Sequence, residues 1–456
     1  MSALTEERGT AHADRKGIFG WMMFDWATQP FHTLIITFVF APYFTSHVAA
    51  NSVSGQEIWG YATGFGGLLI AVLAPIFGAI ADKTGPRKPW IVFFSIFGVV
   101  GCCMLWFAMP NVSSIWIAVV GVILGLIGME MAAVFNNAMM PNLVPRGRLG
   151  RLSGNAWALG YIGGIVSLII VLGLLVGQPN SGKTIIGLTP IGLDQETFAG
   201  ERASGPLTAI WYVLLVIPMF LFTPDARRSL MSHREAVTEG MQELIRTLKT
   251  LPAQKSFFSY LVSSMLYRDA LNALYAFGGI YAAGVLGWSI VQIGIFGILA
   301  ALTGVFGAWL GGKADDRFGP KMVVSVGITV LIICCLMIVS TSKTEVFFIT
   351  VGTDDVPSSA PTIVFYVAGC LIGAAGAALQ AASRVLLVDQ VEPERVTEAF
   401  GLYALSGKAT TFIGPLMIAV ATGMFDSQRI GVTPVIILFV AGMVLLPPVC
   451  SAHSKA

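Results

Sequence analysis

One stretch of this sequence occurs twice: Gly78-Ala79-Ile80-Ala81-Asp82-Lys83-Thr84-Gly85-Pro86-Arg87, and again Gly312-Lys313-Ala314-Asp315-Asp316-Arg317-Phe318-Gly319-Pro320-Lys321. The matching positions are 234 residues apart (316 − 82 = 234). The shared pattern is a glycine, an aspartate about one helical turn later, a cation, and a Gly-Pro turn with further positive charge. Such a pattern is typical of a helix that ends in a basic loop. Long apolar runs flank both copies, so the sequence predicts two related halves.

The composition is that of a protein with many membrane-spanning helices. Of the 456 residues, 55% are hydrophobic and only 11% are charged, whereas soluble domains carry roughly 25% charged residues. The mean hydropathy is +0.78. No basic patch with interleaved aromatic residues suggests a nucleic-acid partner, and no nucleophile–base pair or metal-ligand cluster suggests an enzyme. We therefore expect no enzymatic activity, no cofactor and no metal site.

The chain contains a series of apolar runs that are long enough to cross a bilayer as helices, which takes about 20 residues. These runs predict an all-α membrane protein. The runs lie at 18–46, 57–81, 88–109, 113–142, 150–177, 206–223, 256–285, 288–313, 320–341, 360–391, 396–424 and 430–450. These twelve runs predict two pseudo-symmetric six-helix bundles, over residues 18–223 and 256–451. Two related membrane halves of this kind are typical of alternating-access transporters.

The positions of Lys and Arg predict the orientation, because cations concentrate in cytoplasmic loops. With the N-terminus in the cytoplasm, nearly all loop cations are cytoplasmic, and the exceptions are Lys183, Arg202, Lys343 and Arg429. Cytoplasmic tails are expected at 1–17 and 452–456. The segment 224–255 joins the two halves, and its spacing of apolar residues predicts a short amphipathic helix on the cytoplasmic face.

Four further stretches resemble one branch of the major facilitator superfamily. They are Phe24-Asp25-Trp26-Ala27, Met140-Pro141-Asn142-Leu143-Val144-Pro145, Gly154-Asn155-Ala156-Trp157-Ala158-Leu159-Gly160-Tyr161 and Phe400-Gly401-Leu402-Tyr403-Ala404-Leu405-Ser406-Gly407-Lys408. Together with the duplicated motif, they resemble the autophagy-related vacuolar amino-acid effluxers and their bacterial relatives. The resemblance implies the major facilitator fold and ion-driven export or exchange of small solutes. One departure is Thr28, where this branch usually has asparagine.

Ionisable side chains within a bilayer cost at least roughly 2.5 to 3.5 kcal/mol each at a helix centre, so each one requires a reason. In the N-terminal half, Asp25 and His32 share a face of the first helix. Asp25 is read either as an interfacial carboxylate or as part of a gate or proton path, and His32 as a core histidine or a proton carrier. Glu130, with Asn137 two turns along, is read as a proton-binding carboxylate or as a salt-bridge partner of a cation.

The C-terminal half carries the intramembrane cations. Arg268 and Asp269 fall in one helix, and Asn272 shares the face of Arg268 one turn on. Arg384 is read either as a cavity residue or as an interfacial cation paired with Asp389 or lipid phosphate. Lys408 lies at mid-depth with no route to an interface. Arg268 and Lys408 together predict a site for a carboxylate or phosphate group.

These observations predict a secondary active transporter of a small polar, anionic or zwitterionic solute resembling an amino acid. The proton is the expected coupling ion, with sodium or simple exchange left open. The alternative is a polyspecific proton-coupled exporter of lipophilic compounds, against which Arg268 and Lys408 argue. We expect a monomer in the bacterial inner (plasma) membrane.

The duplicated motif would stabilise one conformational state rather than bind solute, and helix capping is the simpler alternative. Its residues are Gly78, Asp82, Lys83, Gly85, Arg87, Gly312, Asp316, Arg317, Gly319 and Lys321.

Overall fold

The computed structural model is almost entirely helical. It describes residues 13–50, 52–177, 182–191, 193–286, 288, 290–353, 358–410, 413–425 and 427–451. The tails predicted at 1–17 and 452–456 therefore lie largely outside the described residues. Nine helical segments in the described part of the chain are long and apolar enough to cross a membrane.

The N-terminal half runs from the first helix to residue 222. Its elements are α1 (Arg15–Pro30), η1 (Phe31–Phe38), α2 (Phe40–Tyr43), η2 (Phe44–Val48), α3 (Ser52–Thr84), α4 (Lys88–Met104), η3 (Leu105–Phe107), η4 (Val112–Ser114), α5 (Ile115–Met139), η5 (Met140–Asn142), η6 (Arg146–Arg148), α6 (Leu149–Ile170), η7 (Val171–Leu175) and α7 (Ala199–Phe222). Helix α7 begins seven residues before the predicted run at 206. The earlier start is stabilised by Arg202, whose guanidinium donates to the carbonyls of Thr197 and Trp106 at 2.9 and 2.8 Å.

The linker and the C-terminal half follow. The linker holds α8 (His233–Thr250) and η8 (Leu251–Ala253), and the second half consists of α9 (Lys255–Leu286), α10 (Ile290–Phe318), α11 (Pro320–Val339), the two-stranded antiparallel hairpin β1 (Glu345–Val346) and β2 (Ile349–Thr350), α12 (Ala360–Val388), η9 (Pro393–Arg395), α13 (Val396–Ala409), α14 (Ile413–Phe425), α15 (Gln428–Gly431) and α16 (Thr433–Val444). The run at 396–424 was predicted as one span, but the helix is broken after α13. Pro415 lies in the first turn of α14, where a missing N–H is tolerated, so the helix restarts there rather than continuing through it.

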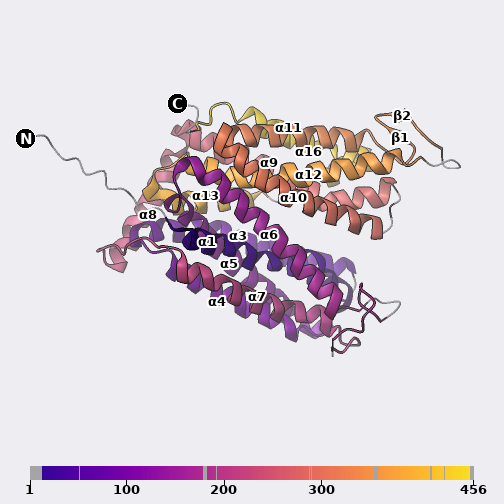
Figure 1. The fold of residues 1–456 in the computed structure, drawn as a ribbon, viewed down its shortest axis with the longest axis horizontal. Coiled ribbons are helices and arrows are strands. Elements are labelled where there is room, and N and C mark those ends of the chain that lie inside the picture. The colour runs from indigo at the N-terminus through magenta and orange to yellow at the C-terminus, as the bar shows by residue number, and fades with distance from the viewer. Residues whose placement is uncertain are drawn as a thin grey trace, which may run out of the picture.

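The two halves lie side by side and approach each other most closely at one end (Figure 1). At that end α3 packs against α13, and α6 packs against α10 and α12. We call it the motif end, because the loops after α3 and α10 that carry the duplicated motif lie there. The opposite end, which carries β1 and β2, is called the hairpin end. The last described residue, Ser451, lies at the motif end, where its hydroxyl contacts Asp389 at 3.2 Å.

Helix α8 lies across the motif end. It starts at a capping box in which Ser232 and Glu235 satisfy each other's backbone N–H groups. Hydrogen bonds from the backbone and the hydroxyl of Ser232 hold the pKa of Glu235 below its usual value. The helix packs along α3, which brings the linker beneath the seam between the halves.

Candidate functional site

The carboxylate of Asp82 joins the two halves at the motif end. Its oxygens accept hydrogen bonds from the backbone N–H groups of Thr397 at 3.2 Å and Glu398 at 2.8 Å, in the first turn of α13. Arg87, from the same half as Asp82, contacts this carboxylate at 2.9 Å, and the two side chains are only 8% and 5% exposed. The first N–H groups of a helix lack intrahelical partners and carry partial positive charge. A buried carboxylate at this position therefore stabilises the contact between α3 and α13.

Asp316 makes the same contact in the other repeat. It accepts a hydrogen bond from the backbone N–H of Arg151 at 3.2 Å, at the start of α6, and pairs with the Arg151 guanidinium at 2.8 Å. Arg151 and Glu398 are 247 residues apart (398 − 151 = 247), the same interval that separates Gly154 from Gly401. The duplicated carboxylates thus reach equivalent helix starts, each in the opposite half.

Two glycines of the motif allow the backbones to approach. A Cβ atom added to Gly78 would lie 2.6 Å from the carbonyl oxygen of Thr397, and one added to Gly312 would lie 2.5 Å from that of Gly150. Both distances are too short for a side chain. At the motif end, the two halves therefore approach so closely that their main chains are in direct contact.

The remaining motif residues hold the loops. Gly85 and Gly319 have φ values of 95° and 86°, which side chains disfavour. Lys321 donates to the carbonyls of Pro447 and Val449 at 2.9 and 2.8 Å. The guanidinium of Arg317 lies over the ring of Phe318, 5.2 Å from its centre. These contacts fix the turns and the end of the described chain without reaching the centre of the bundle.

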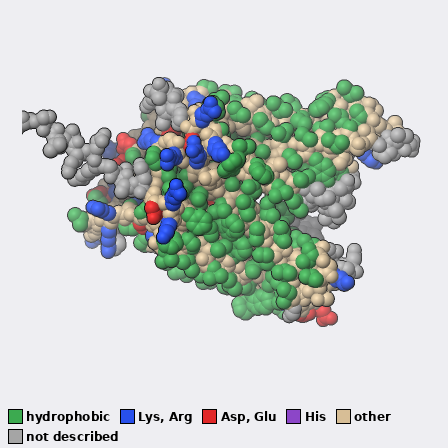
Figure 2. All heavy atoms as spheres, in the orientation of Figure 1, with side chains coloured by type: hydrophobic (Ala, Val, Ile, Leu, Met, Phe, Trp, Pro, Cys, Tyr) green, Lys and Arg blue, Asp and Glu red, His purple; other side chains and the backbone are tan. Residues whose placement is uncertain are grey.

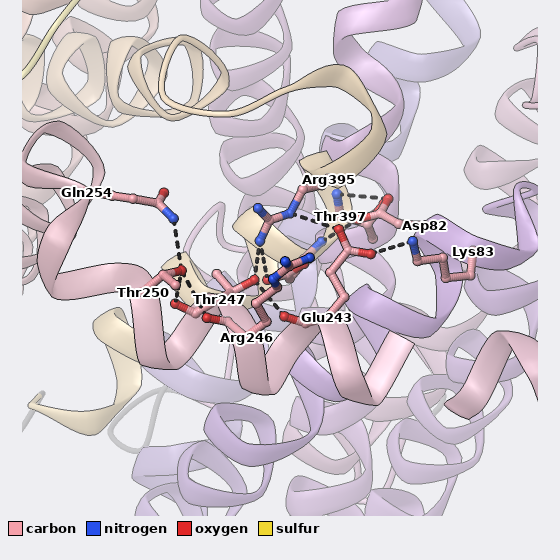
Figure 3. A network of polar contacts seen from close by, with 10 residues as sticks. Asp82, Lys83, Glu243, Arg246, Thr247, Thr250, Gln254, Arg395 and Thr397 are labelled. Carbon is pink, nitrogen blue, oxygen red and sulfur yellow. Dashed lines mark hydrogen bonds and ion pairs between the residues drawn. The ribbon is translucent and has the colours of Figure 1, made fainter. Parts of the chain in front are cut away.

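The linker adds a third contact across the seam, shown in Figure 3. Glu243 of α8 pairs with Lys83 from the N-terminal half and, at 3.3 Å, with Arg395 from the C-terminal half. Arg395 also pairs with Glu398 at 3.1 Å and donates to the hydroxyl of Thr247. Glu243 is 27% exposed, so this bridge is partly screened by solvent.

A buried ion pair between Asp25 and Arg384 crosses the seam one layer deeper. The guanidinium lies 3.0 Å from the Asp25 carboxylate, in α1 of the opposite half. It also donates to the side-chain oxygens of Asn137 at 2.9 Å and Ser153 at 3.2 Å. Arg384 is 5% exposed. All three partners come from the N-terminal half, so this cluster depends on the halves being together.

The surroundings of this pair bear on the alternatives left open for Arg384 and Asp25. Arg384 pairs with Asp25, and α12, which carries Arg384, packs against α6, so its guanidinium lies in the seam. Asp25 likewise contacts the opposite half. Trp157 forms one wall of the cluster, with its ring centre 5.2 Å from the guanidinium carbon.

Arg268 occupies a separate position near the middle of α9, about 20 Å along the helix from its start at Lys255. Its guanidinium lies over the ring of Tyr403, 3.9 Å from the centre, and donates to the carbonyl of the same residue at 3.0 Å. Glu130, from the other half, interacts with it electrostatically. Tyr260 stacks on Tyr403, with the ring centres 6.1 Å apart. Arg268 is therefore held by aromatic packing, with an acid of the opposite half near it.

The structure does not gather all the predicted site residues. Asp269 is 1% exposed, and the hydroxyl of Thr410 is a side-chain partner of its carboxylate. Its backbone lies near Gly414, which places it on the α14 side of α9. Asn272 is exposed on α9, and His32 lies in η1 with its ring edge-to-face with Phe31. Lys408 belongs to α13, but its side chain lies outside the described residues.

Sequence reasoning did not single out several residues at these sites, although Trp157 and Tyr403 lie in two of the stretches that carry the family resemblance. Ser153, Trp157, Tyr403 and Arg151 act through a helix start, a ring or a hydroxyl, which are too common in membrane helices to stand out. One sequence pattern points to Arg151: its separation of 247 residues from Glu398 is the same as that between Gly154 and Gly401. No group of three or more His, Cys, Asp or Glu side chains suited to a metal ion occurs in the part of the chain that the structure describes.

Comparison with known proteins identifies the family. The family model described as "Vacuole effluxer Atg22 like" matches residues 13–456. The chain belongs to this family. Among curated relatives of this Atg22-like protein, an uncharacterized MFS-type transporter, YxiO of Bacillus subtilis, is 27% identical over 93% of both chains. Autophagy-related protein 22 of Yarrowia lipolytica is 20% identical over 61% of this chain and 46% of its own length.

Solved structures show the fold of this Atg22-like chain. The human organic anion transporter MFSD10 superposes with a TM-score of 0.68 at 14% identity, covering 95% of this chain and 99% of its own. The proton:xylose symporter XylE gives a TM-score of 0.67 at 13% identity, covering 94% and 93%. The architecture is that of the major facilitator superfamily, and the protein is an integral membrane protein of a transporter family.

Proposed function

We propose that this protein is a secondary active transporter that moves a small anionic or zwitterionic solute, resembling an amino acid, by alternating access. The observation that carries the proposal is Arg268, a guanidinium near the middle of the bundle with Glu130 of the opposite half in electrostatic range. A cation at this depth is retained only for a partner or a task. An anionic group of the solute would supply the partner in the loaded state.

Stacking on Tyr403 supports this role for Arg268. Aromatic packing orients a guanidinium while leaving its N–H groups in a fork that suits a carboxylate. Lys408, five residues further along α13 than Tyr403, is proposed as a second cation of the site. Asn272 is one helical turn from Arg268 and would contribute an amide.

The seam supports alternating access. The halves meet through Asp82, Asp316 and the Asp25–Arg384 pair, all at or near the motif end. Opening that end requires these contacts to break together. Lys and Arg also gather at the motif end in Figure 2, while hydrophobic side chains cover the body of the visible face. By the rule that cations concentrate inside, the motif end is proposed to be cytoplasmic and this state to be outward-facing.

Proton coupling would follow from competition for Arg268. A solute carboxylate that takes the place of Glu130 beside the guanidinium leaves Glu130 in a low-dielectric site, where the protonated form is favoured. Solute binding and proton uptake are then linked through one cation. Glu130→Gln should retain solute binding and lose its pH dependence.

A thermal-shift screen of the purified full-length protein tests the proposal against amino acids, organic phosphates, sugars and lipophilic cations. A ligand identified in the screen should stabilise the wild type and not Arg268→Ala. Arg429→Ala is the matched control, because Arg429 also pairs with an acid and lies over an aromatic ring, but near the hairpin. Normal binding by Arg268→Ala would contradict the proposal. Stabilisation by lipophilic cations alone would support the polyspecific exporter instead.

A further inference from the structure

A buried carboxylate outside the sites described so far lies in the seam between α6 and α10. Asp315 precedes the motif aspartate and is 1% exposed. Its side chain lies directly on the main chain of the opposite half, since a Cβ atom added to Gly150 would be 2.5 Å from the Asp315 Cβ. Its Oδ2 atom has no hydrogen-bond partner among the residues that the structure describes. The closed motif end thus encloses an acid and leaves one of its carboxylate oxygens unsatisfied.

The charged groups around Asp315 do not compensate it. The ones that act on it most strongly are two other acids, Asp316 on its own helix and Asp389 at the end of α12. The cation of α6 nearest to it, Arg151, is directed at Asp316. The remaining cations of the adjoining elements are engaged elsewhere or exposed: Arg384 with Asp25, Lys313 over Trp309, Arg317 over Phe318, Lys321 with the carbonyls near the end of the chain, and Arg146 and Arg148 in solvent.

The internal repeat shows that this position does not need a carboxylate for packing. The counterpart of Asp315 is Ala81 (315 − 81 = 234), which is completely buried at the equivalent place in α3. A methyl group therefore fills the site in one half, while the other half carries an ionisable group. Burial of an unpaired ionised carboxylate is costly, and protonation removes most of that cost.

We propose that Asp315 is a proton-binding site that links closure of the motif end to pH. The carboxyl group is protonated when α6 and α10 come together, and it releases the proton to water when they separate. Closure therefore becomes more favourable as the pH falls, and a single linked proton changes the ratio of closed to open molecules by at most about tenfold per pH unit. The inference rests on the alternation between two states in the proposed function, but not on Glu130 or on the identity of the solute.

The test measures the distance between spin labels at the motif end without any solute. Cysteines placed at Gly147 and Glu394, which are exposed in opposite halves, carry the labels in full-length protein whose Cys103, Cys370 and Cys450 are replaced by serine. The wild type should shift towards the short distance as the pH falls. Asp315→Asn should favour the short distance at all pH values. In this variant, the pH dependence of the ratio of closed to open molecules should fall by up to about tenfold per pH unit. Asp315→Ala, which installs the residue of the other repeat, should behave in the same way and covers the case in which the amide does not fold.

Glu392→Gln is the control, because it removes one exposed acid from the same end and should keep the wild-type slope. A wild-type slope in both Asp315 variants would overturn the proposal. Since no solute is present, failure to identify a transported compound would count against the proposed function and leave this result standing.

Discussion

Replacing Asp82 by asparagine should open the motif end while leaving the fold intact. The carboxylate accepts two hydrogen bonds from the start of α13 and is 5% exposed. Hydrogen bonds to charged groups contribute about 1.5 to 3 kcal/mol each, and a charge at a helix N-terminus adds about 0.3 to 1 kcal/mol. Asparagine keeps one acceptor oxygen and no charge. We therefore expect a loss of about 2 to 4 kcal/mol from the closed state, which corresponds to roughly a 30- to 1000-fold fall in the ratio of closed to open molecules.

The assay is the same pair of spin labels at residues 147 and 394, read at one pH. Asp225→Asn is the matched control. Asp225, in the linker, caps the N-terminus of α4 through the N–H groups of Arg87 and Lys88 at 2.9 Å each, so this cap is made with the N-terminal half. Its loss should lower thermal stability without changing the distance distribution. If Asp82→Asn gave the same distance distribution as the wild type, the reasoning about the inter-half cap would be refuted.

Three further changes test the other layers of the seam. Asp25→Asn should abolish transport by leaving the Arg384 charge buried without its partner, and an Asp25→Arg, Arg384→Asp double variant should recover part of it in a flux assay; no recovery in a folded double variant would mean that more than the ion pair is required. Glu243→Gln should weaken the closed state by less than about 1 kcal/mol, because the pair is partly exposed, and the difference from wild type should vanish in high salt; a salt-independent change would contradict the electrostatic explanation. Gly154→Val should prevent closure, since a Cβ there would lie 2.3 Å from the carbonyl oxygen of Ala308, and labels at the motif end should then report only the long distance; a closed population would show that α6 can shift.

The duplicated motif, the two halves and the run of apolar segments could be predicted from the sequence, because they depend on local composition and on repetition. The partner of Arg384 could not. Arg384 pairs with Asp25 rather than with Asp389 because of how far α12 is rotated and how closely α6 approaches α12. Both are properties of the packed seam. The break after α13 was missed for a related reason: Pro415 lies within the apolar run predicted at 396–424, and the structure places it in the first turn of a new helix.

The candidate site, too, could be predicted from the sequence only in part. Mid-depth cations such as Arg268 stand out in a sequence because few residues of their type occur within apolar runs. The ring beneath Arg268 and the acid of the opposite half near it became apparent only with the fold. Asp269, adjacent in sequence, was also a candidate site residue, but its backbone lies beside Gly414 of α14, and neighbouring side chains on a helix point about 100° apart.

Two of the donors to Asp82 in α13 are main-chain N–H groups, and the Thr397 side chain is a further partner. A substitution at 397 or 398 therefore keeps the main-chain donors in place unless it introduces proline, which has no N–H. The carboxylate has no such freedom. The side chains at 397 and 398 are constrained for separate reasons, because both are buried and contact Arg87 and Arg395, respectively. Co-variation between position 82 and positions 397 or 398 would therefore not report the main-chain hydrogen bonds that link the halves.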